Sequence, residues 1–224
     1  MGGPLMEWQE AEGVKWLEAP LPGAKVAFST RSVGSVKDDL TPFARVLGLA
    51  PERISVAEQV HGAELTLPGW SPGDDTTEAD GHVIAEPGSA AMVFVADCLP
   101  VALAGPGGVA MLHCGWRGLA AGIVERGAGA VGATHAAIGP GIGPCCYEVG
   151  SEVWEEFEGV GAGIGVKRML DLPEVARGLL MEAGVGEIES ANLCTCCEEE
   201  LFFSHRRDGD RRRQAGLAWI EGGR

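Results

Sequence analysis

The sequence predicts an α/β protein of the α+β kind, in which short apolar strands outnumber helices. Two observations support this prediction: strand-like alternation recurs along the chain, and helix-like spacing is confined to a few segments. The 224 residues can bury a substantial core, and 46% hydrophobic with 22% charged residues is typical of a globular protein. With no internal repeat, we expect one domain over residues 1–224.

Strand patterns run through most of the chain. Two of them, "PVALA" (100–104) and "GVAML" (108–112), flank the turn sequence "GPGG" and together predict a β-hairpin. The remaining predicted strands are "KVAFST" (25–30), "RISVAEQVHG" (53–62), "GHVIAE" (81–86), "AAMVFVADC" (90–98), "HAAIG" (135–139) and "GLAWI" (216–220).

Helical patterns occur in four segments. In "LTPFARVLGLA" (40–50), we expect Thr41 as the N-cap and Pro42 as the first helical residue. The others are "RGLAAGIVERGAGAVG" (117–132), a helix diluted by glycine, "SEVWEEFEG" (151–159) and "PEVARGLLMEAG" (173–184).

The charge balance excludes some classes of partner. Seventeen basic and thirty-two acidic residues leave a net charge of −15, which repels nucleic-acid backbones and anionic membranes. The N-terminal segment has no apolar leader, and the most apolar stretch (89–105) is interrupted by Asp97 and Pro100. We therefore expect a cytoplasmic protein that binds neither nucleic acid nor membrane. Seven cysteines, an odd number, do not suggest a disulfide framework.

The stretch "HCGWRG", at the end of the predicted hairpin, combines a potential metal ligand with an anion-binding arginine. If residues 105–108 form the turn, opposed residue numbers sum to 213, so Pro100 faces His113. Cys98 then lies diagonally from His113 on the same face, roughly 7–8 Å away, within reach of one shared metal ion. Cys114 points to the opposite face and is expected to be a buried core thiol.

The third ligand is expected from "ISVAEQVHG". If this segment is a strand, Ile54, Val56 and Val60 share one face, and His61 lies on the other with Gln59. A hydrogen-bonded structural histidine is the alternative to a metal ligand. Two histidines and one thiolate form a three-ligand zinc site whose fourth position stays open, which is the catalytic arrangement.

Six motifs carry a family resemblance: "FSTR" (28–31), "EQVHG" (58–62), "ADCLPV" (96–101), "HCGWRGLAAGI" (113–123), "GPGIGPCCYEVG" (139–150) and "FFSHRRDG" (202–209). In this order they resemble the bacterial laccase-like polyphenol oxidases, later described as zinc-dependent purine nucleoside phosphorylases. The resemblance implies a four-layer α-β-β-α sandwich with mixed sheets and metal ligands at His61, Cys98 and His113. It also implies phosphorolysis of adenosine, inosine and S-methyl-5′-thioadenosine, with adenosine deamination as a side activity.

Residue chemistry identifies further candidates for such a site. Phosphate suits arginine, because the guanidinium matches an oxyanion with two hydrogen bonds. Asp97 can orient a ligand or transfer a proton, or it can make a structural hydrogen bond. Besides nucleoside and phosphate, a second copy of the chain is possible as a partner, in a monomer or homodimer. The predicted substrate-binding residues are Arg31, Gln59, Arg117 and Arg206, with Arg207 as a further candidate for phosphate.

Two other functions remain open. One is a copper-dependent polyphenol oxidase, since a mixed Cys/His site also takes copper in vitro, although five histidines are few for a multicopper centre. The other is a hydrolase with Cys98 as nucleophile and His61 or His113 as base. Neighbouring cysteines seldom ligate one ion together, so we expect no second structural metal, and the roles of five cysteines stay open: Cys145, Cys146, Cys194, Cys196 and Cys197.

Overall fold

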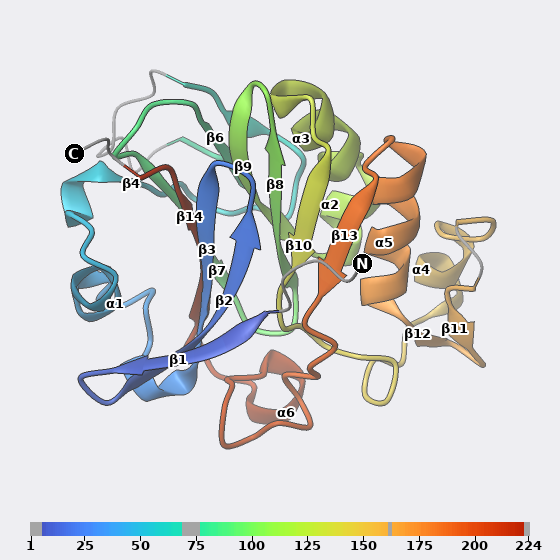
Figure 1. Cartoon of the computed structure of the whole chain (residues 1–224). Helices are drawn as coiled ribbons and strands as arrows, with labels where there is room; N and C mark the ends of the chain where they lie inside the picture. The colour runs from blue at the N-terminus through green and yellow to red at the C-terminus, as the bar shows by residue number, and fades with distance from the viewer. Residues whose placement is uncertain (1–5, 69–76, 161–162, 222–224) are drawn as a thin grey trace.

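The computed structural model describes residues 6–68, 77–160 and 163–221. The first five residues of the N-terminal segment, where we expect no apolar leader, lie outside that part of the chain. Within it, two six-stranded sheets pack face to face and helices cover their outer faces (Figure 1).

The first sheet has the strand order β1-β2-β3-β14-β7-β4. All its neighbouring strands are antiparallel except β4 and β7, which are parallel. Its strands are β1 (Glu7–Ala11), β2 (Val14–Leu21), β3 (Ala24–Ser29), β4 (Ile54–Ser55), β7 (Ala90–Val95) and β14 (Gln214–Trp219).

The second sheet has the order β13-β10-β8-β9-β6-β5 and is also mixed, since its outermost pairs β13–β10 and β5–β6 are parallel. Its strands are β5 (Leu65–Thr66), β6 (Gly81–Ile84), β8 (Leu99–Gly105), β9 (Gly108–Cys114), β10 (His135–Ile138) and β13 (Glu187–Ser190). A separate small ribbon pairs β11 (Gly165–Val166) with β12 (Met169–Leu170).

The helices lie outside the two sheets, with α1 beside the first sheet and α3 and α5 beside the second (Figure 1). The α-helices are α1 (Thr41–Val46), α2 (Trp116–Ala120), α3 (Ile123–Val131), α4 (Ser151–Glu155), α5 (Leu172–Glu182) and α6 (His205–Asp208). The described residues also form the short 3₁₀ helices η1 (Arg31–Val33) and η2 (Pro51–Arg53).

Three hydrophobic cores correspond to the three spaces between four layers. Phe43 of α1 packs with Met92 outside the first sheet. Phe28 and Met111 belong to the core between the sheets. Beyond the second sheet, Leu112 packs in a core that also includes residues of α3 and α5. Strands such as β8 are buried on both faces and therefore read as continuous apolar runs. The predicted α-β-β-α sandwich with mixed sheets is confirmed.

The helix expected at 117–132 is broken. It consists of α2 and α3, and the break falls at Gly122, whose φ of 84° lies in the left-handed region. Glycine adopts that conformation without the steric cost of a side chain. At α1, Thr41 is the first helical residue rather than the N-cap, which is Leu40, and Pro42 is the second helical residue rather than the first.

The prediction of a strand at 53–62 is mostly wrong. Only β4 is formed, and the chain then leaves the sheet, so Val60 is 45% exposed instead of sharing a buried face with Ile54. The alternation of apolar and polar residues indicated a strand here, but hydrogen bonds from residues 60–62 to the side chain of Asp80 determine the path of the backbone. Segments that we had not predicted include β1, β2, β13 and α6.

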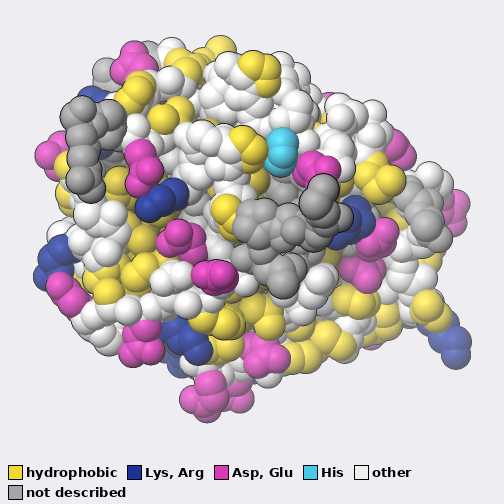
Figure 2. All heavy atoms as spheres, viewed as in Figure 1, with side chains coloured by type: hydrophobic (Ala, Val, Ile, Leu, Met, Phe, Trp, Pro, Cys, Tyr) yellow, Lys and Arg dark blue, Asp and Glu magenta, His cyan; other side chains and the backbone are white. Residues whose placement is uncertain are grey.

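Charged side chains are mixed on the surface. On the face drawn in Figure 2, Lys and Arg side chains of the described residues lie scattered among acidic and uncharged ones. Within the part of the chain that the structure describes, every helix is too short or too polar to traverse a lipid bilayer.

Candidate metal centre

Three side chains predicted as metal ligands converge near one end of the second sheet. His61 comes from the irregular segment after β4, Cys98 from the turn between β7 and β8, and His113 from β9. Their potential ligand atoms all lie within 4.8 Å of one another, and the two imidazole rings meet edge to face at a centroid distance of 4.8 Å. The cluster can hold a metal ion.

The predicted hairpin register is confirmed, because Pro100 pairs with His113 and Leu99 with Cys114. Cys98 directly precedes β8, which places it diagonally from His113. Cys114 is fully buried in the core outside the second sheet, as expected of a core thiol, and this burial raises its pKa.

Two residues at the centre have left-handed backbone conformations that non-glycine residues rarely adopt. The φ angles are 62° for His61 and 84° for Asp97. Each such residue costs of order 1–3 kcal/mol and persists only where the surroundings hold it in place. Here the held conformations aim the side chains of His61 and Cys98 at His113.

Asp80 is the residue that holds His61, and it carried no recognisable signal in the sequence. Its buried carboxylate accepts hydrogen bonds from three consecutive backbone N–H groups, those of Val60 (3.1 Å), His61 (3.0 Å) and Gly62 (2.6 Å). The same carboxylate bonds His113 Nδ1 at 2.7 Å. One buried acid therefore positions both histidines, and it leaves Nε2 of His113 as the nitrogen available to a metal.

Burial and hydrogen bonding have opposite effects on the pKa of Asp80. Burial raises this pKa, but the bonds from His113, Gly62 and Val60 favour the carboxylate and together bring the pKa below its usual value. Asp80 is therefore ionised at neutral pH and can accept all four hydrogen bonds.

Cys98 and His113 stabilise each other's charged forms. Burial lowers the pKa of His113, but hydrogen bonds with Asp80 and Cys98 outweigh it and raise the pKa to about 9. Burial raises the pKa of Cys98, whereas the bonds and charges of His113 and His61 bring it down to about 6. Cys98 is thus a thiolate at neutral pH, the form that binds metals.

Gly115 leaves the space that the cluster needs. A Cβ atom at this position would lie 2.9 Å from Cys98 Sγ and 3.4 Å from His61 Cδ2. Gly115 has φ −82° and ψ 168°, which any residue can adopt, so close approach rather than backbone conformation requires glycine here.

Asp97 and Arg206 are in direct contact. The carboxylate of Asp97 accepts from the backbone N–H of Arg206 at 2.6 Å and from Thr195 Oγ1 at 2.7 Å. The Arg206 guanidinium donates to the backbone oxygen of Glu148 and lies over the ring of Tyr147, 5.4 Å from its centroid. Asp97 therefore ties two loops to the turn that presents the neighbouring cysteine.

Tyr147, the only tyrosine in the chain, lies among the charges of this region. Burial raises its pKa to about 12, to which the charges of Cys98 and Asp97 add, while those of Arg206 and Arg117 oppose the rise. The phenol therefore stays protonated at neutral pH. Our reading of the sequence did not single out Tyr147.

The side chains of the other predicted substrate-binding residues contact parts of the protein other than the three ligand side chains. Arg31 donates to the backbone oxygen of Glu199 at 2.6 Å, and the Arg117 guanidinium lies over the ring of its neighbour Trp116. The amide of Gln59 makes two hydrogen bonds with the backbone of Phe94 in β7.

Arg207, the further phosphate candidate, is occupied by Asp208 and by the backbone oxygens of the 195–202 loop.

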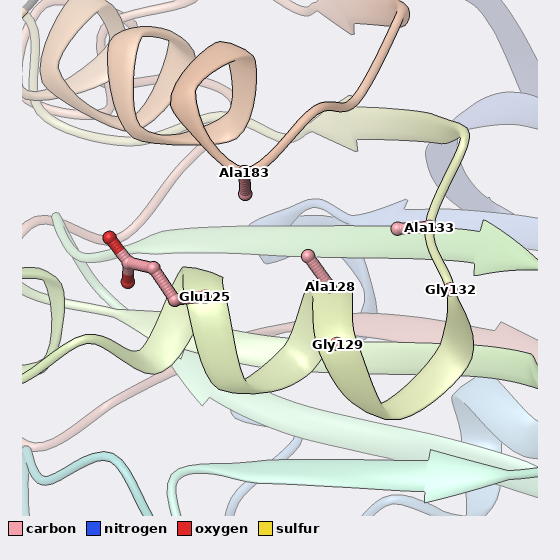
Figure 3. Close-up of a pocket in the computed structure, with 6 residues that line it drawn as sticks. All are labelled: Glu125, Ala128, Gly129, Gly132, Ala133 and Ala183. Carbon is pink, nitrogen blue, oxygen red and sulfur yellow. The ribbon is translucent and has the colours of Figure 1, made fainter.

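A hollow lies between α3 and the end of α5 (Figure 3). Only Glu125 of its lining residues is charged, and none of them belongs to the His61–Cys98–His113 cluster. The lining residues are Glu125, Ala128, Gly129, Gly132, Ala133 and Ala183.

The fold is that of a four-layer α-β-β-α protein, and its His/Cys/His cluster runs from the exposed His61 through the half-buried Cys98 to the buried His113. Comparisons with known proteins identify the family. Residues 28–221 match the family described as multi-copper polyphenol oxidoreductase laccase, so the chain belongs to that family. It is 37% identical over 186 residues to purine nucleoside phosphorylase YfiH of Escherichia coli (strain K12), covering 77% of this chain and 76% of the relative. It is 34% identical over 242 residues to a purine nucleoside phosphorylase of Deinococcus radiodurans, covering 93% and 92%. Among solved structures, YlmD from Geobacillus stearothermophilus has a TM-score of 0.81 at 30% identity, covering 97% of this chain and 100% of that one.

Proposed function

We propose that this protein is a zinc-dependent purine nucleoside phosphorylase acting on adenosine, inosine and S-methyl-5′-thioadenosine. The observation that carries the proposal is the His61–Cys98–His113 cluster in a chain whose relatives are named purine nucleoside phosphorylases. The reaction breaks the bond between the purine and C1′ of the ribose, forms a bond from C1′ to a phosphate oxygen, and leaves the base with a proton.

The donor set fits zinc. Two imidazole nitrogens and one thiolate are ligands that Zn²⁺ prefers, and three protein ligands leave a fourth position open. The second ring nitrogen of His113 is bound by a carboxylate, a common arrangement behind histidine ligands of zinc. When bound, zinc supplies a Lewis acid that stabilises developing negative charge and acidifies water, which also accounts for a deaminase side activity.

The residues around the cluster have separate roles in this proposal. Asp80 orients His61 and His113, and Arg206 with Arg117 supplies the positive charge that a phosphate dianion needs in a protein of net charge −15. Asp97 holds the backbone of Arg206 in place. Arg31 and Gln59 stay candidates for substrate contacts.

The test is phosphate dependence with a defined metal. Zinc-loaded protein is expected to release adenine or hypoxanthine only when phosphate is present, together with one equivalent of ribose 1-phosphate. Cys98→Ala and His113→Ala should lose the metal of this site and the activity, because an incomplete shell binds weakly. Cys114→Ala is the matched control, since its thiol faces the core and the variant should keep both.

Copper-dependent phenol oxidation is the second candidate, supported by the description of the family. By the usual order of divalent affinities, a Cys/His cluster of this kind is expected to bind copper more tightly than zinc. If only copper-loaded protein turns over, and its substrates are phenols, the phosphorylase proposal is wrong.

A further inference from the structure

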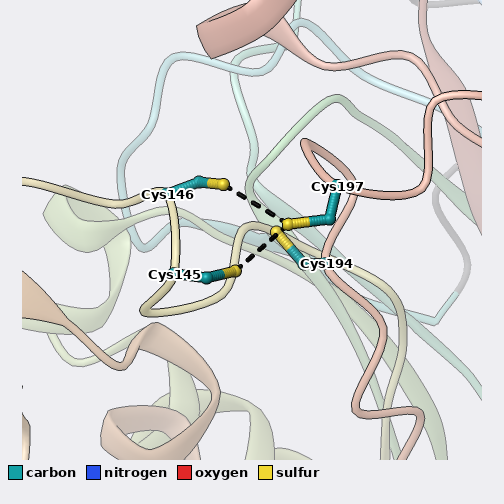
Figure 4. A group of neighbouring side chains, drawn as sticks. All are labelled: Cys145, Cys146, Cys194 and Cys197. Atoms are coloured by element: carbon teal, nitrogen blue, oxygen red, sulfur yellow. Dashed lines mark hydrogen bonds between the residues drawn. The ribbon is translucent and has the colours of Figure 1, made fainter.

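A second group of ligating side chains lies outside the centre described above. Cys145 and Cys146 come from the loop after β10, and Cys194 and Cys197 from the loop after β13. Their four sulfur atoms point toward one another (Figure 4) and all lie within 4.8 Å of each other. Cys197 Sγ lies 3.3 Å from Cys145 Sγ and 3.5 Å from Cys146 Sγ.

The spacing of these sulfurs suits a single tetrahedral ion. With zinc–sulfur bonds of about 2.3 Å, the sulfur–sulfur edges of a tetrahedron measure about 3.8 Å. The distances in the structure, from 3.3 Å up to the 4.8 Å limit, lie on both sides of that value. Small side-chain rotations would therefore bring all four thiolates to one ion.

The backbone holds the two loops in register. Gly141 pairs with Cys194 in a parallel bridge, Thr195 N–H donates to Gly141 O at 3.0 Å, and Gly143 N–H donates to Cys194 Sγ at 3.3 Å. A backbone N–H directed at a cysteine sulfur favours its thiolate form.

Our expectation of no second metal rested on the adjacency of cysteines, and it overlooked the Cys194-x₂-Cys197 spacing typical of zinc ligands. Adjacent residues diverge in a strand, but Cys145 and Cys146 lie in a turn, where both side chains can point to one side.

The surroundings favour an ion over a disulfide. Cys197 Sγ lies at similar distances from two other sulfurs, whereas a disulfide pairs each sulfur with one other only. The guanidinium of Arg207, which is paired with Asp208, donates to the backbone oxygens of Thr195 and Cys196 and so holds the loop that carries Cys194 and Cys197.

We propose that Cys145, Cys146, Cys194 and Cys197 bind a structural zinc ion, separate from the His61–Cys98–His113 centre. The ion joins the two loops that border the candidate active site. Thr195, which lies between two of its ligands, donates to the carboxylate of Asp97. The second zinc thus maintains the position of Asp97 while taking no part in the reaction, so the proposal is independent of the proposed activity.

The experiment compares the metal content of variants by elemental analysis after purification with zinc and gel filtration. Cys145→Ser/Cys197→Ser should contain one zinc per chain fewer than the wild type, and so should Cys98→Ser. The triple variant should contain two fewer. Cys196→Ser is the matched control, because it removes a thiol from the same loop that lies outside the cluster, and it should keep the wild-type content.

Cobalt provides a second readout, which leaves all four proposed ligands in place. Wild-type protein loaded with Co²⁺ should show the intense charge-transfer absorption of four thiolates, and Cys98→Ser should retain most of it. Equal zinc in the wild type and Cys145→Ser/Cys197→Ser would overturn the proposal, as would a Cys145–Cys197 disulfide in the protein purified under reducing conditions. If the single substitution Cys98→Ser abolished the strong cobalt absorption, the proposal would also be wrong, because this variant keeps all four proposed ligands.

Discussion

Asp80→Asn tests how one buried carboxylate supports both the fold and the metal centre. In the wild type, Oδ2 accepts from Val60 and Gly62, and Oδ1 accepts from His61 and His113. Asparagine has one acceptor oxygen, so its NH₂ group must face two of the four donors in either orientation. Each buried donor left unsatisfied costs about 1–3 kcal/mol. We therefore expect the free energy of unfolding to fall by about 2–6 kcal/mol.

The same change should weaken metal binding. Loss of the carboxylate partner of a histidine ligand typically lowers metal affinity about 10–100-fold. Urea unfolding of metal-free protein measures the first effect, and zinc competition with a chelator measures the second. Asp171→Asn is the matched control, because asparagine replaces aspartate well at the N-cap of α5. The role assigned to Asp80 is wrong if the free energy of unfolding of Asp80→Asn lies within about 0.5 kcal/mol of the wild-type value and the variant binds zinc equally well.

Three further changes test the site and the fold. Gly115→Ala should lower zinc affinity about tenfold or more while the protein stays folded, because its Cβ would press on Cys98 Sγ; an unchanged dissociation constant would contradict this contact. Arg206→Lys should raise the phosphate KM about tenfold with unchanged zinc content, since charge is kept but paired hydrogen bonding is lost; equal losses in adenosine deamination would assign the arginine to the nucleoside or the fold. His82 is buried, and burial lowers its pKa from 6.5 to about 4, so the unfolded chain takes up a proton that the folded protein refuses. As the pH falls from 6.5 to 4, the wild type should therefore lose about 3 kcal/mol more of its free energy of unfolding than His82→Gln does. Urea unfolding at each pH measures this difference, and parallel pH profiles of the two proteins would refute it.

Local patterns were sufficient wherever one interaction within a short stretch decides the structure. The hairpin of β8 and β9 follows from two apolar runs and a glycine-proline turn, so its register placed Cys98 beside His113 and Cys114 in the core. The order of the six motifs likewise indicated the family, and the four layers were expected from that resemblance rather than from the local patterns.

The tertiary structure alone decided the path of residues 56–62 and the grouping of cysteines. The alternation around His61 indicated a strand, but three hydrogen bonds to Asp80, nearly twenty residues away, hold this segment outside the sheet. Cys145 and Cys197 meet only because β10 and β13 pair in parallel and their following loops leave the same edge of the sheet. Such contacts join residues distant in the chain, and their free energy depends on which groups are buried together, which no local pattern encodes.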